Sequence, residues 1–298
     1  MIKKENIRLP NGEELSYIKL GSGDKNLILI HGNYATSYQY IPLLKDIPLN
    51  FTIYAIDLRG FGDSSYYRRI QSLEDFANDI VLFTNLLKIE KFSVIGWSLG
   101  GGVAMQLAAI LNDKVEKLVL ISSTTYKGYP LYKKDDNGNL VYGDAYSNPE
   151  DLLNDKFQVK PIVDMIETNN IKGMKSWLAR NFYGESIIDD ETLEQLAIES
   201  LKQRNLIDAS FALATFNMGS MHNFYTAGNH AINHIKCPIL HIVGQEDKVT
   251  PKYMSLENYY RLLDQSKLLE YERCGHSLLI DNPDAIDKIY KFIERNSN

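Results

Sequence analysis

The sequence is poor in cysteine, in long hydrophobic runs and in positive charge. It has 2 cysteines among 298 residues, Cys237 and Cys274, too few for a disulfide framework or for a zinc site built on cysteine. The longest apolar runs, such as residues 27–30, are far too short to cross a bilayer. The charged residues at the start are not followed by the apolar segment of a signal peptide. We therefore expect a cytoplasmic protein with free thiols and no membrane partner.

The balance of charge is acidic. Lysine and arginine number 32 against 38 aspartates and glutamates, which gives a formal net charge of −6. Because nucleic-acid-binding proteins carry a basic surface, we expect no nucleic-acid partner. Hydrophobic residues make up 44% of the chain and charged residues 23%, a composition typical of a globular protein rather than a disordered one.

Short apolar runs alternate with amphipathic stretches in much of the chain. The runs that predict buried strands lie at residues 27–30, 52–56, 92–95, 115–121, 238–243 and 268–271. Between the second and third runs, Phe76, Ile80 and Phe83 recur at helical spacing after Ser72, a residue type that caps helices. Such alternation predicts an α/β protein with a parallel sheet covered by helices.

The alternation stops after Ser122 and resumes near residue 238. The residues between are rich in tyrosine, lysine and asparagine and contain amphipathic segments but no apolar strand. These segments lie at residues 152–157, 162–167, 174–182, 192–201 and 208–218. We therefore predict a core domain formed by residues 1–123 and 234–298, with a helical lid inserted at residues 124–233.

Residues 92–104 indicate a strand, a sharp turn and a helix, with a serine at the turn. The turn reads Gly96-Trp97-Ser98-Leu99-Gly100, and Gly-x-Ser-x-Gly in this context is typical of a nucleophilic serine. Glycine at both flanking positions avoids Cβ clashes in a strained turn. A serine hydroxyl is a weak nucleophile at neutral pH, so the chemistry also needs a base.

Two residues suited to assist Ser98 follow later predicted strands. Asp247 follows residues 238–243, and His276 follows residues 268–271. The carboxyl ends of parallel strands meet at one edge of a sheet, where sites form. Histidine suits the role of base because its pKa lies near working pH, and a carboxylate fixes its tautomer. We predict that Ser98, Asp247 and His276 form a catalytic triad.

Glu246 is the alternative to Asp247 as the acid of the triad. Because successive side chains at a strand end point to opposite faces, we expect Glu246 and Asp247 to point in opposite directions. Residues 122–125, which follow an earlier strand, contain no carboxylate, and this also favours Asp247.

Attack by Ser98 would create an oxyanion, which needs N–H donors. The Leu99 N–H follows the nucleophile directly, and a second donor can come from the loop after residues 27–30, from Asn33 or Tyr34. We assign the oxyanion hole to Asn33 and Leu99. Tyr34 and Trp97 are predicted to contact the substrate.

These motifs, taken in order, resemble the alpha/beta-hydrolase family over nearly the whole chain. They are His31-Gly32, Asp57-x-Arg59-Gly60-x-Gly62-x-Ser64, Gly96-x-Ser98-x-Gly100-Gly101, Gly244-x-x-Asp247 and Gly275-His276. The resemblance implies a mostly parallel eight-stranded sheet, a lid inserted after the sixth strand, and hydrolysis without a cofactor. The sequence around Ser98 is similar to the carboxylesterase branch.

The resemblance implies a serine hydrolase that cleaves esters or lactones of small to medium acyl compounds through an acyl-enzyme. Perhydrolases and C–C bond hydrolases in the family use the same triad and remain alternatives. His31-Gly32-Asn33 resembles the haloalkane dehalogenases, but their nucleophile is aspartate, so Ser98 argues against that reaction. A small-molecule receptor that retains the triad is the alternative from another class of protein.

The remaining candidate residues are interpreted structurally. We expect His31 to brace the oxyanion loop, and Asp57 and Arg59 to hold their own turn. His230 and His234 have the spacing at which a helix could present both to a metal ion, but no third ligand recurs at matching spacing. We predict no metal site.

Overall fold

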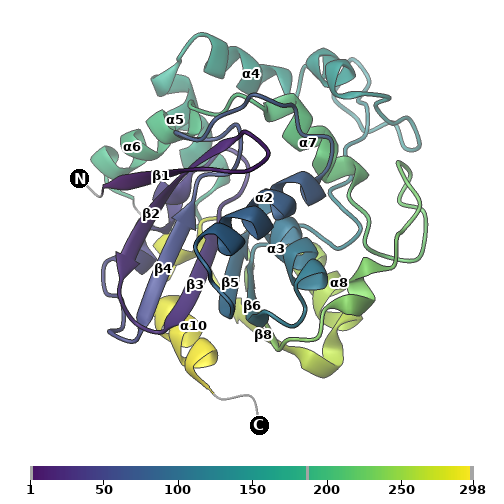
Figure 1. Ribbon diagram of the computed structural model, residues 1–298. Helices are drawn as coiled ribbons and strands as arrows, with labels where there is room; N and C mark the ends of the chain where they lie inside the picture. Colours follow the sequence, from purple (N-terminus) through teal and green to yellow (C-terminus); the bar gives the residue numbers. More distant parts are fainter. Residues whose placement is uncertain (1–2, 186–187, 296–298) are drawn as a thin grey trace.

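The computed structural model describes residues 3–185 and 188–295 and contains one eight-stranded sheet (Figure 1). The strands are β1 (Lys4–Arg8), β2 (Glu14–Gly21), β3 (Lys25–Ile30), β4 (Phe51–Ile56), β5 (Phe92–Trp97), β6 (Val115–Ile121), β7 (Ile239–Gly244) and β8 (Ser266–Tyr271). Their order across the sheet is β1-β2-β4-β3-β5-β6-β7-β8. The strands from β3 to β8 pair in parallel, whereas β1 with β2 and β2 with β4 are antiparallel. The predicted mostly parallel α/β sheet is confirmed.

Helices cover both faces of this sheet. The longer ones are α2 (Leu73–Leu86), α3 (Leu99–Ile110), α8 (Lys252–Arg261) and α10 (Asp284–Glu294), and short ones are α1 (Ile41–Leu44) and α9 (Leu278–Asp281). The side chains of β3 alternate between two hydrophobic clusters, as a pleated strand requires. Ile28 and Ile30 pack in the cluster of α2 and α3, whereas Leu27 and Leu29 pack in the cluster of α1 and α10.

The start of α2 lies where its sequence predicted it. Ser72 precedes the first helical residue in an extended conformation. The Asp75 carboxylate accepts the Ser72 N–H at 3.0 Å, which satisfies a backbone group near the N-terminus of the helix. Phe76, Ile80 and Phe83 are fully buried, as the predicted stripe required.

The described residues between 124 and 233 form helices and irregular segments but no strand. The helices are α4 (Lys160–Glu167), α5 (Ile171–Asn181), α6 (Asp190–Ser200) and α7 (Leu206–Thr215), and the 3-10 turns are η2 (Pro149–Asn154) and η3 (Ala231–His234). Figure 1 shows α4 to α7 gathered on one side of the molecule. Ala209 and Ala212 of α7 join the cluster of α2 and α3, so this insertion is anchored in the core. The division into a core and a lid stays a prediction.

Two details of the insertion differ from the sequence-based expectation. Residues 152–157 are only partly helical, because the 3-10 turn η2 ends at Asn154 and the Asp155 carboxylate then accepts the N–H groups of Phe157 and Gln158, each at 2.9 Å. A side chain that bonds nearby backbone donors in this way competes with helix formation. His230 and His234 do not share a regular helix either, since His230 has a φ of 61° and precedes the short η3.

Candidate active site

Ser98 lies at the sharp turn between β5 and α3. Its φ is 58° and its ψ is −121°, a strained conformation for a residue with a side chain. The turn is also crowded, since a Cβ on Gly96 would lie 2.3 Å from the Gly100 carbonyl oxygen, and one on Gly100 would lie 2.1 Å from that of Ile30. Only glycine fits at these two positions, which explains the spacing of the motif.

Asp247 and His276, from the loops after β7 and β8, form a buried pair. The Asp247 Oδ2 lies 2.9 Å from the His276 Nδ1, and both side chains are at most 1% exposed. The carboxylate therefore fixes the tautomer of the imidazole, with the proton on Nδ1 and Nε2 free to accept one. Glu246 is exposed, so the buried partner of His276 is Asp247 rather than Glu246.

Hydrogen bonds hold the Asp247 carboxylate on both oxygens. Its Oδ1 accepts the N–H groups of Val249 at 2.9 Å and Thr250 at 2.8 Å, and its Oδ2 lies 2.8 Å from the Thr250 hydroxyl. Burial by itself raises the pKa of Asp247, but the interaction with His276 and these hydrogen bonds bring it below its usual value. The carboxylate is thus ionised at neutral pH.

Sequence reasoning missed Thr250. Its hydroxyl lies 3.2 Å from the His276 Nδ1 and 2.8 Å from the Ser122 carbonyl oxygen. Asp-x-x-Thr after a strand is typical of a turn closed by the aspartate side chain, and this signal could have indicated the contact.

Ser98 and His276 open onto the same cavity, of about 240 Å³. Its wall combines loops at the strand ends with residues of the insertion. From residues 1–123 and 234–298, the wall contains Asn33, Tyr34, Ser98, Leu99, Lys248, Val249, Thr250 and His276. Those of the insertion are Thr124, Tyr129, Leu131, Phe157, Gln158, Val159, Trp177, Asn181, Ser210 and Leu213. Residues 1–123, residues 234–298 and the insertion between them therefore all contribute to one site.

The candidate oxyanion residues meet at the wall of this cavity. Leu99 is the first residue of α3, where backbone N–H groups lack helical partners. Asn33 and Tyr34 line the same cavity. The Tyr34 N–H donates to the Gln203 Oε1 at 3.0 Å, so this amide is engaged, and Asn33 stays the predicted second donor.

Tyr34 and Trp97, both predicted to contact substrate, have different positions. Tyr34 lines the cavity, with its ring 4.9 Å from that of Trp177. Trp97 is 3% exposed and is not among the wall residues. Its indole packs against the imidazole of His276 and donates to that residue's carbonyl. Trp97 therefore lies behind the histidine rather than beside a ligand.

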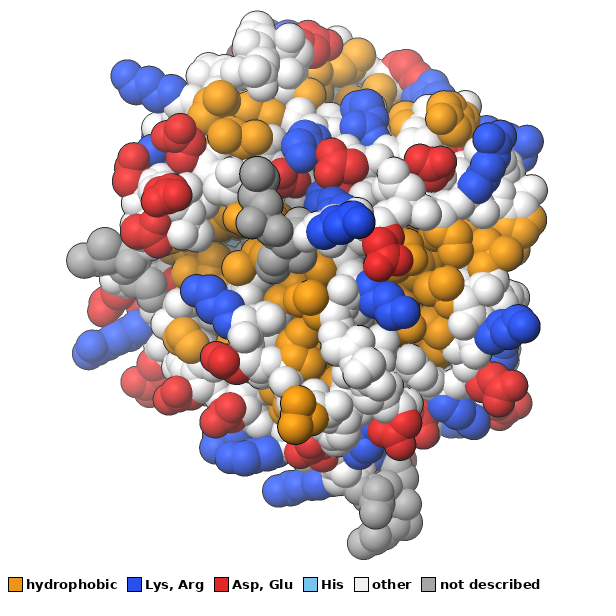
Figure 2. All heavy atoms as spheres, turned by 60° about the vertical axis from the view of Figure 1, so that its left-hand side comes forward, with side chains coloured by type: hydrophobic (Ala, Val, Ile, Leu, Met, Phe, Trp, Pro, Cys, Tyr) orange, Lys and Arg blue, Asp and Glu red, His pale blue; other side chains and the backbone are white. Residues whose placement is uncertain are grey.

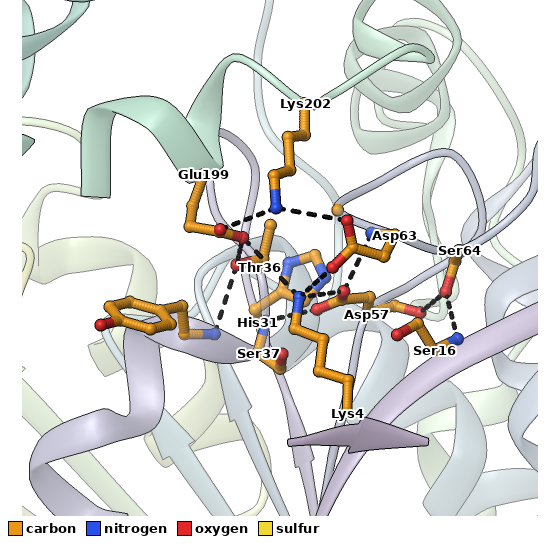
Figure 3. Close-up of polar contacts among 12 residues, drawn as sticks. Lys4, Ser16, His31, Thr36, Ser37, Asp57, Asp63, Ser64, Glu199 and Lys202 are labelled. Atoms are coloured by element: carbon orange, nitrogen blue, oxygen red, sulfur yellow. Dashed lines mark hydrogen bonds and ion pairs between the residues drawn. The ribbon is translucent and has the colours of Figure 1, made fainter. Parts of the chain in front are cut away.

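His31 and Asp57 stabilise the loops that follow β3 and β4 (Figure 3). The His31 Nε2 accepts the Leu58 N–H at 3.0 Å, and its Nδ1 donates to the Gly32 carbonyl at 2.8 Å. Burial lowers the pKa of His31 to about 4, so the imidazole is neutral. The Asp57 carboxylate accepts the Ser37 N–H at 2.8 Å and the Lys4 ammonium at 2.7 Å. The contacts of His31 fit the bracing role expected for it. Asp57 accepts the Asp63 N–H of its own turn at 3.1 Å, as expected, and also joins that turn to Ser37 and Lys4.

One face of the molecule is mixed in charge. On the face shown in Figure 2, lysine and arginine side chains are interspersed with aspartate and glutamate. Within residues 3–185 and 188–295, no group of three or more histidine, cysteine or acidic side chains has the arrangement of a metal site. No helix in the described part of the chain is both long and apolar enough to cross a membrane.

Known proteins resemble this chain in sequence. A methyl ester esterase for pimeloyl-[acyl-carrier protein] from Neisseria meningitidis serogroup C is 26% identical over 275 residues, covering 91% of this chain and 94% of that protein. The bifunctional esterase/perhydrolase DCH of Acinetobacter calcoaceticus is 25% identical over 284 residues, covering 93% and 95%.

Solved structures and a family model also match this chain. An esterase from Thermogutta terrifontis superposes with a TM-score of 0.72 at 20% identity, over 98% of this chain and 100% of the other. The enol-lactonase from Burkholderia xenovorans LB400 gives 0.74 at 17% identity, over 98% and 100%. At these identities the likeness shows the fold. The sequence model described as alpha/beta hydrolase fold matches residues 25–283, and the chain therefore belongs to the alpha/beta hydrolase fold family.

Proposed function

We propose that this protein is a serine hydrolase that cleaves carboxylic esters or lactones of small to medium acyl compounds. The observation that carries the proposal is the buried Asp247–His276 pair, 2.9 Å apart, whose histidine opens onto the same cavity as Ser98. Relatives that cover most of the chain are esterases, and this supports the same class of reaction.

In the proposed mechanism, the Ser98 hydroxyl attacks the ester carbonyl while its proton passes to the His276 Nε2. The Nδ1–H stays bonded to Asp247, whose negative charge stabilises the imidazolium. The tetrahedral intermediate expels the alcohol, which takes the proton from His276, and an acyl-Ser98 remains. Water then loses a proton to His276 and attacks the acyl carbon, releasing the acid and restoring the serine.

The N–H groups of Asn33 and Leu99 are the proposed oxyanion donors. Both residues line the cavity with Ser98. Fixed backbone donors stabilise the charge that develops on the carbonyl oxygen without having to reorganise during the reaction.

The cavity supports a modest, largely apolar acyl group. Its wall includes side chains such as Leu131, Val159, Trp177 and Leu213, all from the insertion. The insertion would thus select the acyl chain, while the loops at the strand ends supply the chemistry. This division is the proposed role of residues 124–233 as a lid.

Active-site labelling tests the proposal directly. A fluorophosphonate should modify the wild-type protein at Ser98, as mapped by mass spectrometry of its peptides. Ser98→Ala should abolish hydrolysis of p-nitrophenyl butyrate and keep the circular dichroism spectrum. Ser210 also lines the cavity and is the internal control, because labelling at Ser210 instead of Ser98 would refute the assignment of the nucleophile.

Perhydrolysis is a second candidate, favoured by the esterase/perhydrolase among the relatives. In that reaction hydrogen peroxide replaces water as the attacking group, and acyl-Ser98 gives a peracid. Adding peroxide to an ester or short carboxylic acid and measuring peracid formation distinguishes it from plain hydrolysis.

A further inference from the structure

The backbone of Tyr34 is strained and is held by side chains of the insertion. Its φ is 58°, a left-handed conformation that costs free energy for a residue other than glycine. The Tyr34 N–H donates to the Gln203 Oε1 at 3.0 Å, and the Tyr34 carbonyl accepts the Ser200 hydroxyl. Both peptide groups of this residue are therefore bound by the segment at the end of α6.

The same glutamine also binds Asn33. Its Nε2 donates to the Asn33 Oδ1 at 2.8 Å and to the Asn205 Oδ1 at 3.1 Å. Asn205 in turn donates to the Arg59 carbonyl at 2.7 Å. Gln203 is only 1% exposed. Because both ends of its amide are bonded, its orientation is fixed, and it fixes the peptide that joins Asn33 to Tyr34.

A charged cluster anchors the end of α6 to the core, as Figure 3 shows. Glu199 accepts the Thr36 hydroxyl at 2.9 Å and pairs with Lys202 at 2.8 Å. The Lys4 ammonium lies 2.7 Å from Asp57 and 3.7 Å from Glu199. The insertion thus holds the loop of residues 33–37 at Asn33, Tyr34 and Thr36.

These contacts could serve only to attach the insertion to the core. Their placement argues for more, because they converge on the strained residue and on its neighbour Asn33, whose N–H is the proposed oxyanion donor. Engaging the Tyr34 N–H also sets the plane of the peptide bond, and with it the direction of the adjacent backbone. Attachment alone would not require the buried amide of Gln203 to bond both residues.

We propose that Gln203, assisted by Ser200, is a positioning residue that aims the Asn33 N–H at the oxyanion. This inference rests on the proposed serine hydrolase mechanism. Gln203 lies behind the loop and acts through it. The insertion would then contribute to the rate of the chemical step as well as to the choice of acyl group.

The variant Gln203→Met tests the inference, because methionine has a similar length but neither bonds the Tyr34 N–H nor donates to Asn33. Misplaced catalytic groups cost up to about 100-fold in rate, and loss of an oxyanion donor costs about 100-fold or more. We expect kcat with p-nitrophenyl butyrate to fall by roughly 10- to 100-fold, with KM nearly unchanged.

A trifluoromethyl ketone with a short alkyl chain supplies a second readout. Addition of Ser98 to this ketone creates an oxyanion, so its inhibition constant should weaken in step with kcat/KM across the variants. Butyrate, a product that forms no such oxyanion, should inhibit the variant as well as it inhibits the wild type. A purely structural defect would weaken both inhibitors.

Two further variants complete the test. Ser200→Ala removes the bond to the Tyr34 carbonyl and should lower kcat in the same direction by a smaller factor, which keeps the inference testable if Gln203→Met does not fold. Glu194→Gln is the control. Glu194 lies on α6 with Ser200, and the change disturbs only an exposed contact with Lys175, so kcat should stay unchanged.

Folded Gln203→Met with wild-type kcat would overturn the inference, as would an equal loss in Glu194→Gln. The proposed function fails separately, if the fluorophosphonate does not label Ser98 in the wild-type protein. If the fluorophosphonate labels Ser98 and Gln203→Met keeps the wild-type kcat, the proposed hydrolase function is retained. Only the positioning role of Gln203 is then refuted.

Discussion

Trp97 supports His276 from behind. The indole Nε1 donates to the His276 carbonyl at 2.8 Å, and the two rings lie 4.7 Å apart. The residue just before the proposed nucleophile thus fixes the backbone of the proposed base. This contact links the sharp turn after β5 to the loop after β8.

Trp97→Phe should therefore impair the chemical step rather than substrate binding. The change keeps an aromatic ring against the imidazole but removes the hydrogen bond. We expect kcat for p-nitrophenyl butyrate to fall by about tenfold through misplacement of the base, with KM unchanged. Trp177→Phe is the matched control, because Trp177 lines the cavity, and it should raise KM. If Trp97→Phe raises KM and keeps kcat, Trp97 contacts the substrate, as expected from the sequence.

Asp247→Asn should be nearly inactive. The amide cannot supply the charge that stabilises the imidazolium and can favour the wrong tautomer, which costs roughly 10⁴-fold in kcat in serine proteases. Glu246→Gln changes a neighbouring acidic residue that is exposed, and its kcat should stay within about twofold of the wild type. Steady-state kinetics on both variants decide between the two acids, and a loss of less than tenfold in Asp247→Asn would favour Glu246.

The buried His241 should make the protein less stable as the pH falls. Burial lowers its pKa to about 3 from an ordinary 6.5, so the unfolded chain takes up the proton first. The stability that this neutral imidazole contributes is complete above pH 6.5 and declines as the pH falls toward 3, by about 2 kcal/mol at pH 5.

His241→Leu removes this titration. Urea unfolding at pH 7 and pH 5 should show a smaller loss of stability between the two pH values in the variant than in the wild type. His234→Leu, which removes an exposed imidazole, should show the wild-type loss. An unchanged pH dependence in His241→Leu would contradict the prediction.

Arg59 and Asp79 form a buried two-point ion pair that should matter for stability but not for catalysis. The Arg59 Nη2 and Nε lie 2.6 and 2.7 Å from the two carboxylate oxygens. Asp79→Asn leaves the buried guanidinium without its counter-charge, and we expect a loss of about 3 kcal/mol in the free energy of unfolding.

The control for Asp79→Asn is Asp164→Asn, which breaks an exposed pair with Lys160 and should cost about 0.5 kcal/mol or less. At a temperature where Asp79→Asn is folded, its kcat should equal that of the wild type. A comparable effect of both variants on the urea midpoint would contradict the predicted stability contribution of the buried pair. A large fall in kcat would show that Arg59 does more than hold its turn.

Much of the core was predictable because its signals are local. Apolar runs such as residues 27–30 and 115–121 predicted strands that the structure contains as β3 and β6. Each lies between polar loops and needs no distant contact to be recognised. The capped start of α2 after Ser72 was found for the same reason.

The insertion was less predictable. Residues 152–157 have helical periodicity, yet the Asp155 carboxylate binds the following N–H groups and ends the helical turn. Spacing alone does not reveal which of two local hydrogen-bonding patterns is more stable. The same limit applies to Trp97, whose position in the motif indicates nothing about whether it faces a ligand or His276.

The sequence by itself determined the parallel sheet, the strained turn at Ser98 and the position of Asp247 and His276 after strands, because these depend on residues adjacent in the chain. The tertiary structure decided which groups support them. Tyr34 meets Gln203 across 169 positions, and Trp97 meets His276 across 179. Such contacts follow from how the strands cross over and how the insertion packs on their ends, and no local pattern of residue types specifies that packing.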